Sequence, residues 1–238
     1  MNSSELFFRL KSIAENDIIC DVGLANISEL DHSLCQTYTS AVSIIVPLSK
    51  GVLKEIIDKP TITYFSHYRA VNKKIDELTL KLALEIEKQD YLAYPIPASQ
   101  SDPFNSNSYS AVFPHKTAAV LAGKGWIGKN ALFIHHRFGP AVRLGTVLTT
   151  FESEKVIPMK SRCENCKKCR INCPAQAIEG VQWTIGMKRN QLIDVYACSE
   201  YMKSVFQNIG RGSVCGLCIV NCPYAQIKEV DKNDTKSL

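Results

Sequence analysis

Apolar residues recur at helical spacing in three segments of the chain. In the segment 4–14 they fall every three or four residues, and Ser3 or Ser4 precedes them as a candidate cap. The same spacing continues along the segment 70–91, where lysines and glutamates occupy the opposite side. A shorter run covers 114–122. The pattern predicts three helices that pack one face on a core.

Four other segments have the composition of strands. Residues 18–24, 42–48, 131–136 and 141–150 are rich in the β-branched and apolar residues that suit a pleated sheet. Between helix and strand signals, residues 95–112 carry the proline, serine and asparagine content of a loop. A loop of that length in a compact domain is usually functional. The pattern therefore indicates a mixed α and β chain.

Composition is that of an ordinary enzyme of a reducing compartment. The 238 residues are 45% hydrophobic and 21% charged, enough to bury a full core, and the net charge of +5 is compatible with an anionic ligand or RNA but argues for neither. Charged residues interrupt the first 16 residues, so they lack the apolar stretch of a signal peptide. The longest apolar run, 41–48, is too short to span a bilayer. We expect a cytoplasmic protein without a membrane anchor, in which thiols stay reduced.

Eight of the ten cysteines fall in or near two related motifs. The first reads Cys163-x2-Cys166-x2-Cys169-x3-Cys173-Pro174, and the second reads Cys215-x2-Cys218-x3-Cys222-Pro223. This spacing is typical of a loop that wraps a 4Fe-4S cluster, and the cysteine before the proline serves the other cluster of a pair. Two motifs therefore predict two clusters and one-electron chemistry.

The ligands can be assigned to clusters from the alignment of the two motifs. The second motif has Gly212 where the first has Cys163, and Cys198 is the nearby cysteine that can replace the missing thiolate. Eight thiolates would then fill eight corners and leave no open iron for a substrate. We assign cluster one to Cys163, Cys166, Cys169 and Cys222, and cluster two to Cys173, Cys198, Cys215 and Cys218.

Zinc is the alternative metal for these cysteines. Tetrahedral zinc sites also use Cys-x2-Cys pairs, but they rarely carry a third cysteine at this spacing and a fourth before a proline. Disulfides are disfavoured because nothing in the sequence suggests export. Cys20 and Cys35 lie outside the motifs, and we expect them to be buried, inert thiols.

A glycine-rich turn at 122–130 imitates two nucleotide-binding motifs. Gly123, Gly125 and Gly128 have the spacing of a dinucleotide fingerprint, and the stretch also approximates a phosphate-binding loop. Both motifs need a strand before the glycines and a helix after them, whereas here a helical segment precedes and a strand-like segment follows. Asn130 also replaces the serine or threonine that a phosphate loop requires. A backbone with so few side chains can instead lie flat against a large planar ligand.

Together these motifs resemble a known family. The stretches GWIGKNALFI, VRLGTVLT, CENCKKCRINCP, ACSEY and CGLCIVNCPYAQ resemble the cobalamin-dependent epoxyqueuosine reductases, which are related to the reductive dehalogenases. The resemblance implies an α+β protein, with a nitroreductase-like α/β domain at 1–153 that holds base-off cobalamin and substrate. A bacterial ferredoxin-like module with two 4Fe-4S clusters would occupy 154–228, and 229–238 would be a polar tail. The nearer cluster would reduce the corrin cobalt to nucleophilic Co(I).

The resemblance also implies which residues line the corrin. For Trp126 and Leu144, packing in the protein core is an equally good explanation. The other cobalamin-binding pattern, Asp-x-His-x-x-Gly, is absent, which fits cobalt without a protein ligand and fits a protein without cobalamin equally well. The implied lining residues are Gly125, Trp126, Ile127, Gly128, Lys129, Asn130, Arg143, Leu144 and Gly145.

The chain departs from the family in two respects. Epoxyqueuosine reductases place a proton-donating aspartate before the glycine-rich turn, but here no carboxylate lies between Asp102 and the turn. Proton delivery would fall to Tyr109, as in the dehalogenases, or to His115, which could equally be a surface histidine. The helical repeats that help the tRNA-modifying enzymes grip RNA are also missing, so tRNA is a doubtful partner.

Two functions are compatible with these observations. The first is a cobalamin-dependent reductase that takes electrons from a donor such as ferredoxin or flavodoxin and reduces a small-molecule substrate. The second is an electron-transfer or corrinoid-handling protein that transforms no substrate. The loop at 95–112 and the basic Arg137 and Arg143 favour the first, whereas the missing carboxylate and the full set of cluster ligands favour the second. We expect an oxidoreductase.

Overall fold

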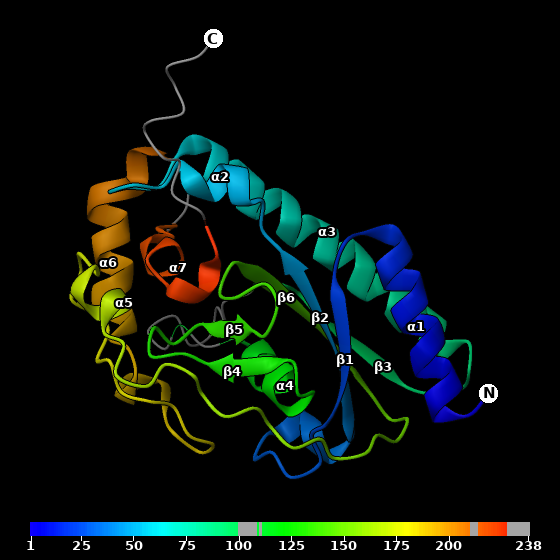
Figure 1. Ribbon diagram of the computed structural model, residues 1–238. Helices are drawn as coiled ribbons and strands as arrows, with labels where there is room; N and C mark the ends of the chain where they lie inside the picture. The colour runs from blue at the N-terminus through cyan, green and yellow to red at the C-terminus, as the bar shows by residue number, and fades with distance from the viewer. Residues whose placement is uncertain (100–108, 110, 210–213, 228–238) are drawn as a thin grey trace.

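The computed structural model describes residues 1–99, 109, 111–209 and 214–227. Its centre is a four-stranded sheet in the order β1-β2-β6-β3, in which every neighbouring pair is antiparallel (Figure 1). The two central strands are buried along most of their length, as their β-branched composition predicts. The strands are β1 (Asp21–Asn26), β2 (Ser40–Pro47), β3 (Ala93–Ile96) and β6 (Val142–Thr149).

One face of the sheet is covered by the predicted long helix and the N-terminal helix. Helix α1 (Ser3–Asp17) is capped by Asn2, whose side chain accepts the Glu5 N–H, so the predicted cap at Ser3 or Ser4 was wrong. Helix α3 (Ile62–Glu87) begins eight residues before the predicted start because the Thr61 hydroxyl caps its first turn. Both helices contact each other and the sheet (Figure 1).

Helix α4 (His115–Leu121) and a small hairpin lie on the other face (Figure 1). The hairpin pairs β4 (Gly125–Ile127) with β5 (Phe133–His135). Part of the predicted glycine-rich turn is therefore a strand, and the turn itself is confined to the residues between β4 and β5. The predicted order of helix, glycines and strand is confirmed.

The C-terminal third contains the cysteine motifs on short elements. Helices α5 (Lys168–Ile171) and α7 (Leu217–Val220) each carry a motif cysteine, and α6 (Val195–Phe206) carries Cys198. No helix was predicted in this third of the chain, because the cysteine spacing was the only pattern interpreted there. The remaining short elements are α2 (Lys50–Lys54) and the 3-10 turns Ser33–Gln36, Arg189–Gln191, Gln207–Ile209 and Pro223–Ala225.

A single hydrophobic core extends from the sheet into this C-terminal part. Leu217 and Ile219 are buried together with residues of α1 and α3. Gly216 lies so close to α3 that a Cβ would come within 3.1 Å of the Tyr64 ring. The predicted domain boundary at 153 stays a prediction, although apolar packing crosses it.

The predicted strands differ from the structure most at β1 and β3. Strand β1 begins three residues after the predicted start because α1 runs on to Asp17. Residues 95 and 96, predicted as the beginning of a loop, belong to β3. Most of the predicted loop at 95–112 and the whole predicted tail at 229–238 lie outside the described residues.

Gly145 provides a test of how tightly α3 packs on the sheet. A Cβ at this position of β6 would collide with the Ile75 side chain and lie 2.9 Å from Thr79 Cγ2, so we expect Gly145→Ala to lower the free energy of unfolding by about 1–3 kcal/mol. Gly51→Ala in α2 meets only the Ser49 hydroxyl at 3.7 Å and should be neutral or stabilising. Chemical denaturation measures both, and an equal effect would contradict the packing.

Candidate functional site

Four cysteines from distant parts of the chain line one pocket. Burial raises the pKa of the Cys222 thiol to about 11, and the neighbouring Cys163, Cys169 and Cys166 raise it further. Such a group holds several thiolates only if positive charge offsets their mutual repulsion. The four residues that line the pocket are Cys163, Cys166, Cys169 and Cys222.

A second group of four cysteines lies beside the first. Burial raises the pKa of Cys215 to about 11, and Cys198 and Cys173 add to the rise. The Cys218 thiol, whose pKa burial also raises, interacts with these three and with Cys169 of the first group. The members are Cys173, Cys198, Cys215 and Cys218. The two groups are those that the sequence assigned to two clusters, although iron binding itself stays a prediction.

The sequence spacing of the cysteines favours clusters over zinc. Tetrahedral zinc sites use Cys-x2-Cys pairs but rarely add a cysteine three residues further on and before a proline. Both motifs of this chain have such a cysteine, Cys173 in the first and Cys222 in the second.

The turn after β4 connects both cysteine loops to the sheet domain. Lys129 Nζ donates to the carbonyl of Glu164 at 2.5 Å and to that of Cys166 at 3.4 Å, within the first loop. Asn130, 2% exposed, donates from Nδ2 to the Cys218 carbonyl at 3.1 Å, within the second. These two residues were predicted to line a corrin, and that role stays a prediction. Their observed contacts instead position the two loops relative to each other.

Trp126 lies against the first cysteine group. Its side chain is 1% exposed and packs with Cys163 and Cys222, and the Arg162 guanidinium lies 5.5 Å from its ring centroid. Trp126 Nε1 is buried and has no hydrogen-bond partner among the described residues. Buried N–H donors normally have a hydrogen-bond acceptor. A sulfur atom held at this site would provide an acceptor for the indole N–H. The predicted contact of Trp126 with a corrin is not tested by these contacts.

The glycines predicted to line the corrin each have a close internal neighbour. A Cβ at Gly125 would clash with the Ile134 carbonyl across the hairpin, and one at Gly128 would clash with the Ile134 side chain. Ile127 is itself buried in the core beside α4. Packing therefore explains why the hairpin needs glycine, and the role of these residues toward a corrin stays a prediction.

The predicted corrin residues of β6 lie on both faces of the sheet. Arg143 Nε donates to Asn72 of α3 at 2.8 Å, and its guanidinium stacks on Tyr68 with 4.2 Å to the centroid. Gly145 faces α3 as well, whereas Leu144 packs in the cluster on the α4 face. Successive residues of a strand alternate between faces. These three residues therefore cannot all line one face of a flat ligand.

Both ring nitrogens of His115 are engaged inside the protein. Nδ1 lies 2.7 Å from the Thr146 hydroxyl, and Nε2 lies 3.0 Å from the Pro97 carbonyl, to which it must donate. Burial lowers the pKa of His115 to about 4, so the ring is neutral at neutral pH. This geometry favours a structural role and leaves no ring proton free for a substrate.

Tyr109 lies next to two cations of the C-terminal part. Lys203 of α6 donates to its hydroxyl at 3.3 Å, and Arg189 donates to its backbone carbonyl at 2.6 Å. Lys203 also forms an ion pair with Glu200. The Tyr109 hydroxyl therefore accepts a hydrogen bond from a cation of the C-terminal part.

A group of cations lies near Tyr109 and the second cysteine group. Burial lowers the pKa of Lys116 to about 8, and the nearby Arg189 and Arg143 lower it further, whereas Cys218 acts in the opposite sense. Lys116 donates to the Ala131 carbonyl at 2.5 Å. None of the three cations forms an ion pair with another described residue. Such a group suits a ligand with anionic or carbonyl oxygens.

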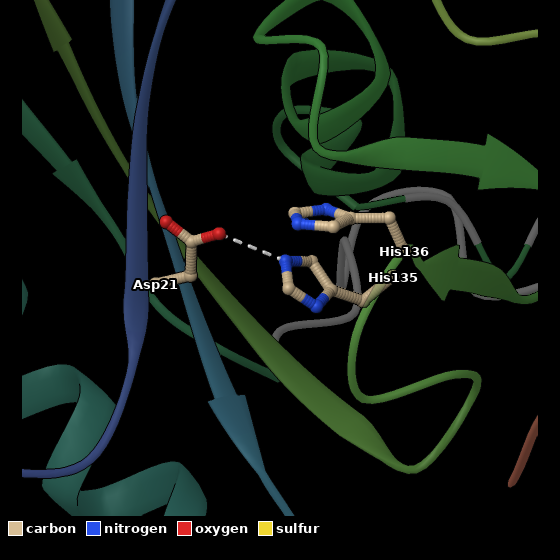
Figure 2. Close-up of side chains that lie close together, drawn as sticks. All are labelled: Asp21, His135 and His136. Carbon is tan, nitrogen blue, oxygen red and sulfur yellow. Dashed lines mark hydrogen bonds and ion pairs between the residues drawn. The ribbon is translucent and has the colours of Figure 1, made fainter.

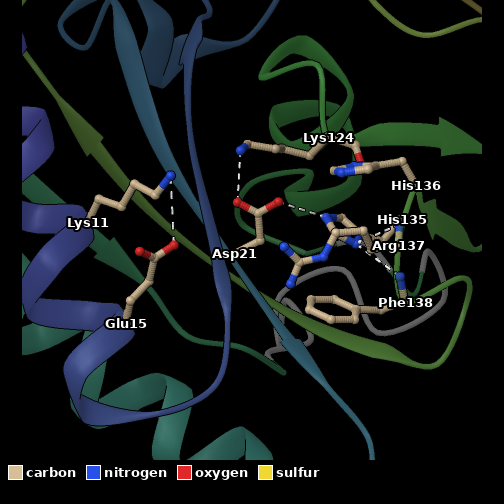
Figure 3. Close-up of polar contacts among 8 residues, drawn as sticks. All are labelled: Lys11, Glu15, Asp21, Lys124, His135, His136, Arg137 and Phe138. Atoms are coloured by element: carbon tan, nitrogen blue, oxygen red, sulfur yellow. Dashed lines mark hydrogen bonds and ion pairs between the residues drawn. The ribbon is translucent and has the colours of Figure 1, made fainter.

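Sequence analysis missed a polar cluster between β1 and the hairpin, in which Asp21 and His135 are buried and His136 is exposed. Asp21, His135 and His136 lie close together, and Lys124 Nζ donates to the Asp21 carboxylate at 2.8 Å (Figures 2 and 3). Burial raises the pKa of Asp21, but hydrogen bonds from His135 and Lys124 outweigh burial and hold it well below its usual range. No local sequence pattern reveals this cluster, because 114 residues separate Asp21 from His135.

The hydrogen bonds of this cluster do not suit a metal ion. His135 Nδ1 accepts the backbone N–H groups of Arg137 and Phe138, so its proton lies on Nε2 and is donated to Asp21 at 3.0 Å (Figure 3). His135 therefore has no free lone pair for a cation, and the Lys124 ammonium already neutralises the carboxylate. The cluster fastens β1 to the hairpin.

The two cysteines outside the motifs are buried, as predicted. Cys20 and Cys35 are each 7% exposed, and burial raises the pKa of Cys20 to about 12. A thiol with so high a pKa is unreactive near neutral pH.

Comparison with known proteins supports the resemblance seen in the motifs. An alignment 120 positions long, which covers 46% of this chain, is 43% identical to the epoxyqueuosine reductase of Gloeobacter violaceus and covers 35% of that protein. This part of the chain is similar to the epoxyqueuosine reductases. An epoxyqueuosine reductase structure from Bacillus subtilis shares the fold, with a TM-score of 0.63 at 16% identity over 97% of this chain and 68% of the other.

A reductive dehalogenase also shares the fold of this chain. A catabolic reductive dehalogenase in complex with 3-bromo-4-hydroxybenzoic acid superposes with a TM-score of 0.66 at 18% identity, over 87% of this chain and 30% of the other. No family model matches the sequence. Within the described residues, no helix combines the length and the apolar character needed to cross a bilayer. The sequence match spans only about a third of the Gloeobacter protein.

Asn130 tests whether the turn stabilises the second cysteine loop. Asn130→Ala removes the donor to the Cys218 carbonyl and the Oδ1 atom that accepts the Leu132 N–H, so we expect the free energy of unfolding to fall by about 1–3 kcal/mol. The exposed Asn16 of α1 provides the control, and Asn16→Ala should change stability by less than about 0.5 kcal/mol. Urea denaturation under anaerobic conditions measures both, and similar effects would refute the contact.

The lowered pKa of His115 predicts that the folded protein loses stability in mild acid. The unfolded chain binds a proton at this ring near its ordinary pKa of 6.5, whereas the folded chain binds it only near 4. The contribution of neutral His115 is therefore fully present above pH 6.5 and is lost as the pH falls through that window. The stability advantage of the wild type over His115→Gln should shrink between pH 6.5 and 4. Parallel stability curves in denaturant titrations would contradict this.

Proposed function

We propose that the chain is a cobalamin-dependent iron-sulfur reductase that passes electrons through two 4Fe-4S clusters to a small substrate. The observation that carries the proposal is the division of eight cysteines into two adjacent groups of four. Cys218 interacts with cysteines of both groups, so electrons would have a short path between the clusters. The relatives that share this fold are named as reductases.

The second cysteine group lies beside the cation group of Lys116, Arg189 and Arg143. Cys218 and Lys116 are close enough to interact, and Arg189 interacts with Cys198. Lys116, Arg189 and Arg143 would bind the amide and phosphate oxygens of cobalamin or an anionic group of the substrate. When bound, cobalamin would supply a low-potential metal centre for reductive removal of oxygen or halogen.

Tyr109 is the proposed proton donor beside these cations. Its hydroxyl accepts a hydrogen bond from Lys203, and Arg189 donates to its backbone carbonyl. The alternative donor, His115, has both nitrogens engaged and a pKa of about 4. We therefore assign proton delivery to Tyr109 and a positioning role in α4 to His115.

A second function without turnover is compatible with the same cysteines. Four thiolates per cluster leave no iron open to a substrate, as in proteins that only transfer electrons. Such a protein would reduce the cobalt of a partner or carry a corrinoid, and it would not need Tyr109.

The two functions differ in the effect of a Tyr109 substitution. After anaerobic reconstitution with iron, sulfide and cobalamin, and with reduced ferredoxin as the electron donor, we expect halide release from a brominated phenol, in which two electrons and one proton replace the carbon–bromine bond by a carbon–hydrogen bond. Tyr109→Phe should lower the turnover by about 10²-fold or more. The hydroxyl is lost but the ring beside Lys203 is retained. Binding of cobalamin, followed by equilibrium dialysis, should be the same in both proteins.

The controls separate the possible outcomes. His115→Gln should retain turnover, because it preserves the polar contacts of the ring. Cobalamin binding without turnover of halogenated or epoxide substrates would favour the corrinoid-handling function. A protein that holds its clusters and binds no cobalamin would exclude both corrinoid functions and leave an electron carrier.

A further inference from the structure

The positive charge of the chain is concentrated around the first cysteine motif. Residues 160–172 contain five lysines or arginines and one glutamate, so this segment holds four of the five net positive charges of the whole chain. All five cationic side chains are exposed. None of them forms an ion pair with a described residue. The basic segment consists of Lys160, Arg162, Lys167, Lys168 and Arg170, with Glu164 as its acidic residue.

The basic segment surrounds the ligands of the proposed cluster one. Arg162 immediately precedes Cys163, and Lys167 and Lys168 separate Cys166 from Cys169. The local fold keeps the cations at the surface while Cys163 and Cys169 remain only 8% and 9% exposed. A partner that contacts these side chains would therefore come close to cluster one.

An apolar side chain is exposed next to these cations. Ile171 of α5 is 76% exposed and lies three residues after Lys168, on the same side of the helix. A single exposed isoleucine is common on protein surfaces. Here it adds an apolar contact within a positively charged rim, which is the composition of protein–protein interfaces.

We propose that the basic segment is the docking face for an acidic one-electron carrier protein that reduces cluster one. This inference rests on the proposed function. The carrier would lose one electron and cluster one would gain it, so two successive dockings supply the two electrons of one substrate reduction. Complementary charge raises the association rate of such weak, transient complexes, whose interfaces are small.

RNA is the competing occupant of a basic surface, because phosphates also bind exposed lysines. Two observations favour the carrier. The cations lie directly around cysteines that would hold a redox centre, and Ile171 adds an apolar contact that a phosphate backbone does not need.

The experiment measures how fast a reduced, acidic two-cluster ferredoxin reduces the iron-sulfur absorbance of the reconstituted protein. We expect Lys160→Glu/Lys168→Glu to slow the second-order rate at low ionic strength by about tenfold or more. The wild-type rate should fall as salt is added, and that of the variant should fall less or rise. Lys160→Gln/Lys168→Gln should slow the rate by an intermediate factor. This neutral variant replaces the charge-reversed one in the test if the charge reversal impairs folding.

The matched control changes the same charge on another face. Lys73 and Lys81 are exposed on α3 and form no ion pair with a described residue, so Lys73→Glu/Lys81→Glu should keep the wild-type rate within about twofold. Photoreduced deazaflavin, a small reductant that needs no docking face, should reduce all variants at the same rate. Equal slowing in the control, or no slowing in the charge-reversed variants, would overturn the proposal.

Two further outcomes are informative. If the charge reversal abolishes binding of an RNA stem-loop while the ferredoxin rate is unchanged, the surface binds RNA and the proposal is wrong. If the ferredoxin rate is unchanged in the charge-reversed variant but the protein holds iron and is reduced by deazaflavin, only the proposed docking face is wrong, and the proposed function still stands. A protein that assembles no clusters would overturn the proposed function together with the docking face.

Discussion

The structure depends on how eight thiols can be held close together inside a protein. Burial and mutual repulsion raise the pKa of Cys215 and Cys222 to about 11, so without a metal these sites would remain protonated near neutral pH. Iron supplies the positive charge that stabilises thiolates in such a place. The two groups of four, whose sequence spacing is that of cluster-binding loops, are therefore best explained as sites for clusters.

The remaining fold positions the two cysteine groups relative to each other and to the cations Lys116 and Arg189. The turn between β4 and β5 reaches both cysteine loops through Lys129 and Asn130, and the core around α3 continues into α7. One group lies beneath the exposed basic segment, and the other lies beside Lys116 and Arg189. In the proposed function, this arrangement would provide an entry side and a delivery side for electrons.

The sequence predicted those features whose signal is local. The grouping of the cysteines follows from spacings of two and three residues, and α4 from a short amphipathic run. Contacts across 35 to 114 residues, such as Lys129 with Glu164 and Asp21 with His135, have no periodic signal. The split of Arg143 and Leu144 between two faces could have been predicted, because neighbouring side chains of a strand alternate.

The central claim concerns the metal, and the direct measurement is the metal and sulfide content of anaerobically purified protein. Two cubanes predict about eight iron and eight acid-labile sulfide per chain, with the brown colour of 4Fe-4S clusters. A colourless protein, or one that contains zinc in place of iron, would contradict the account.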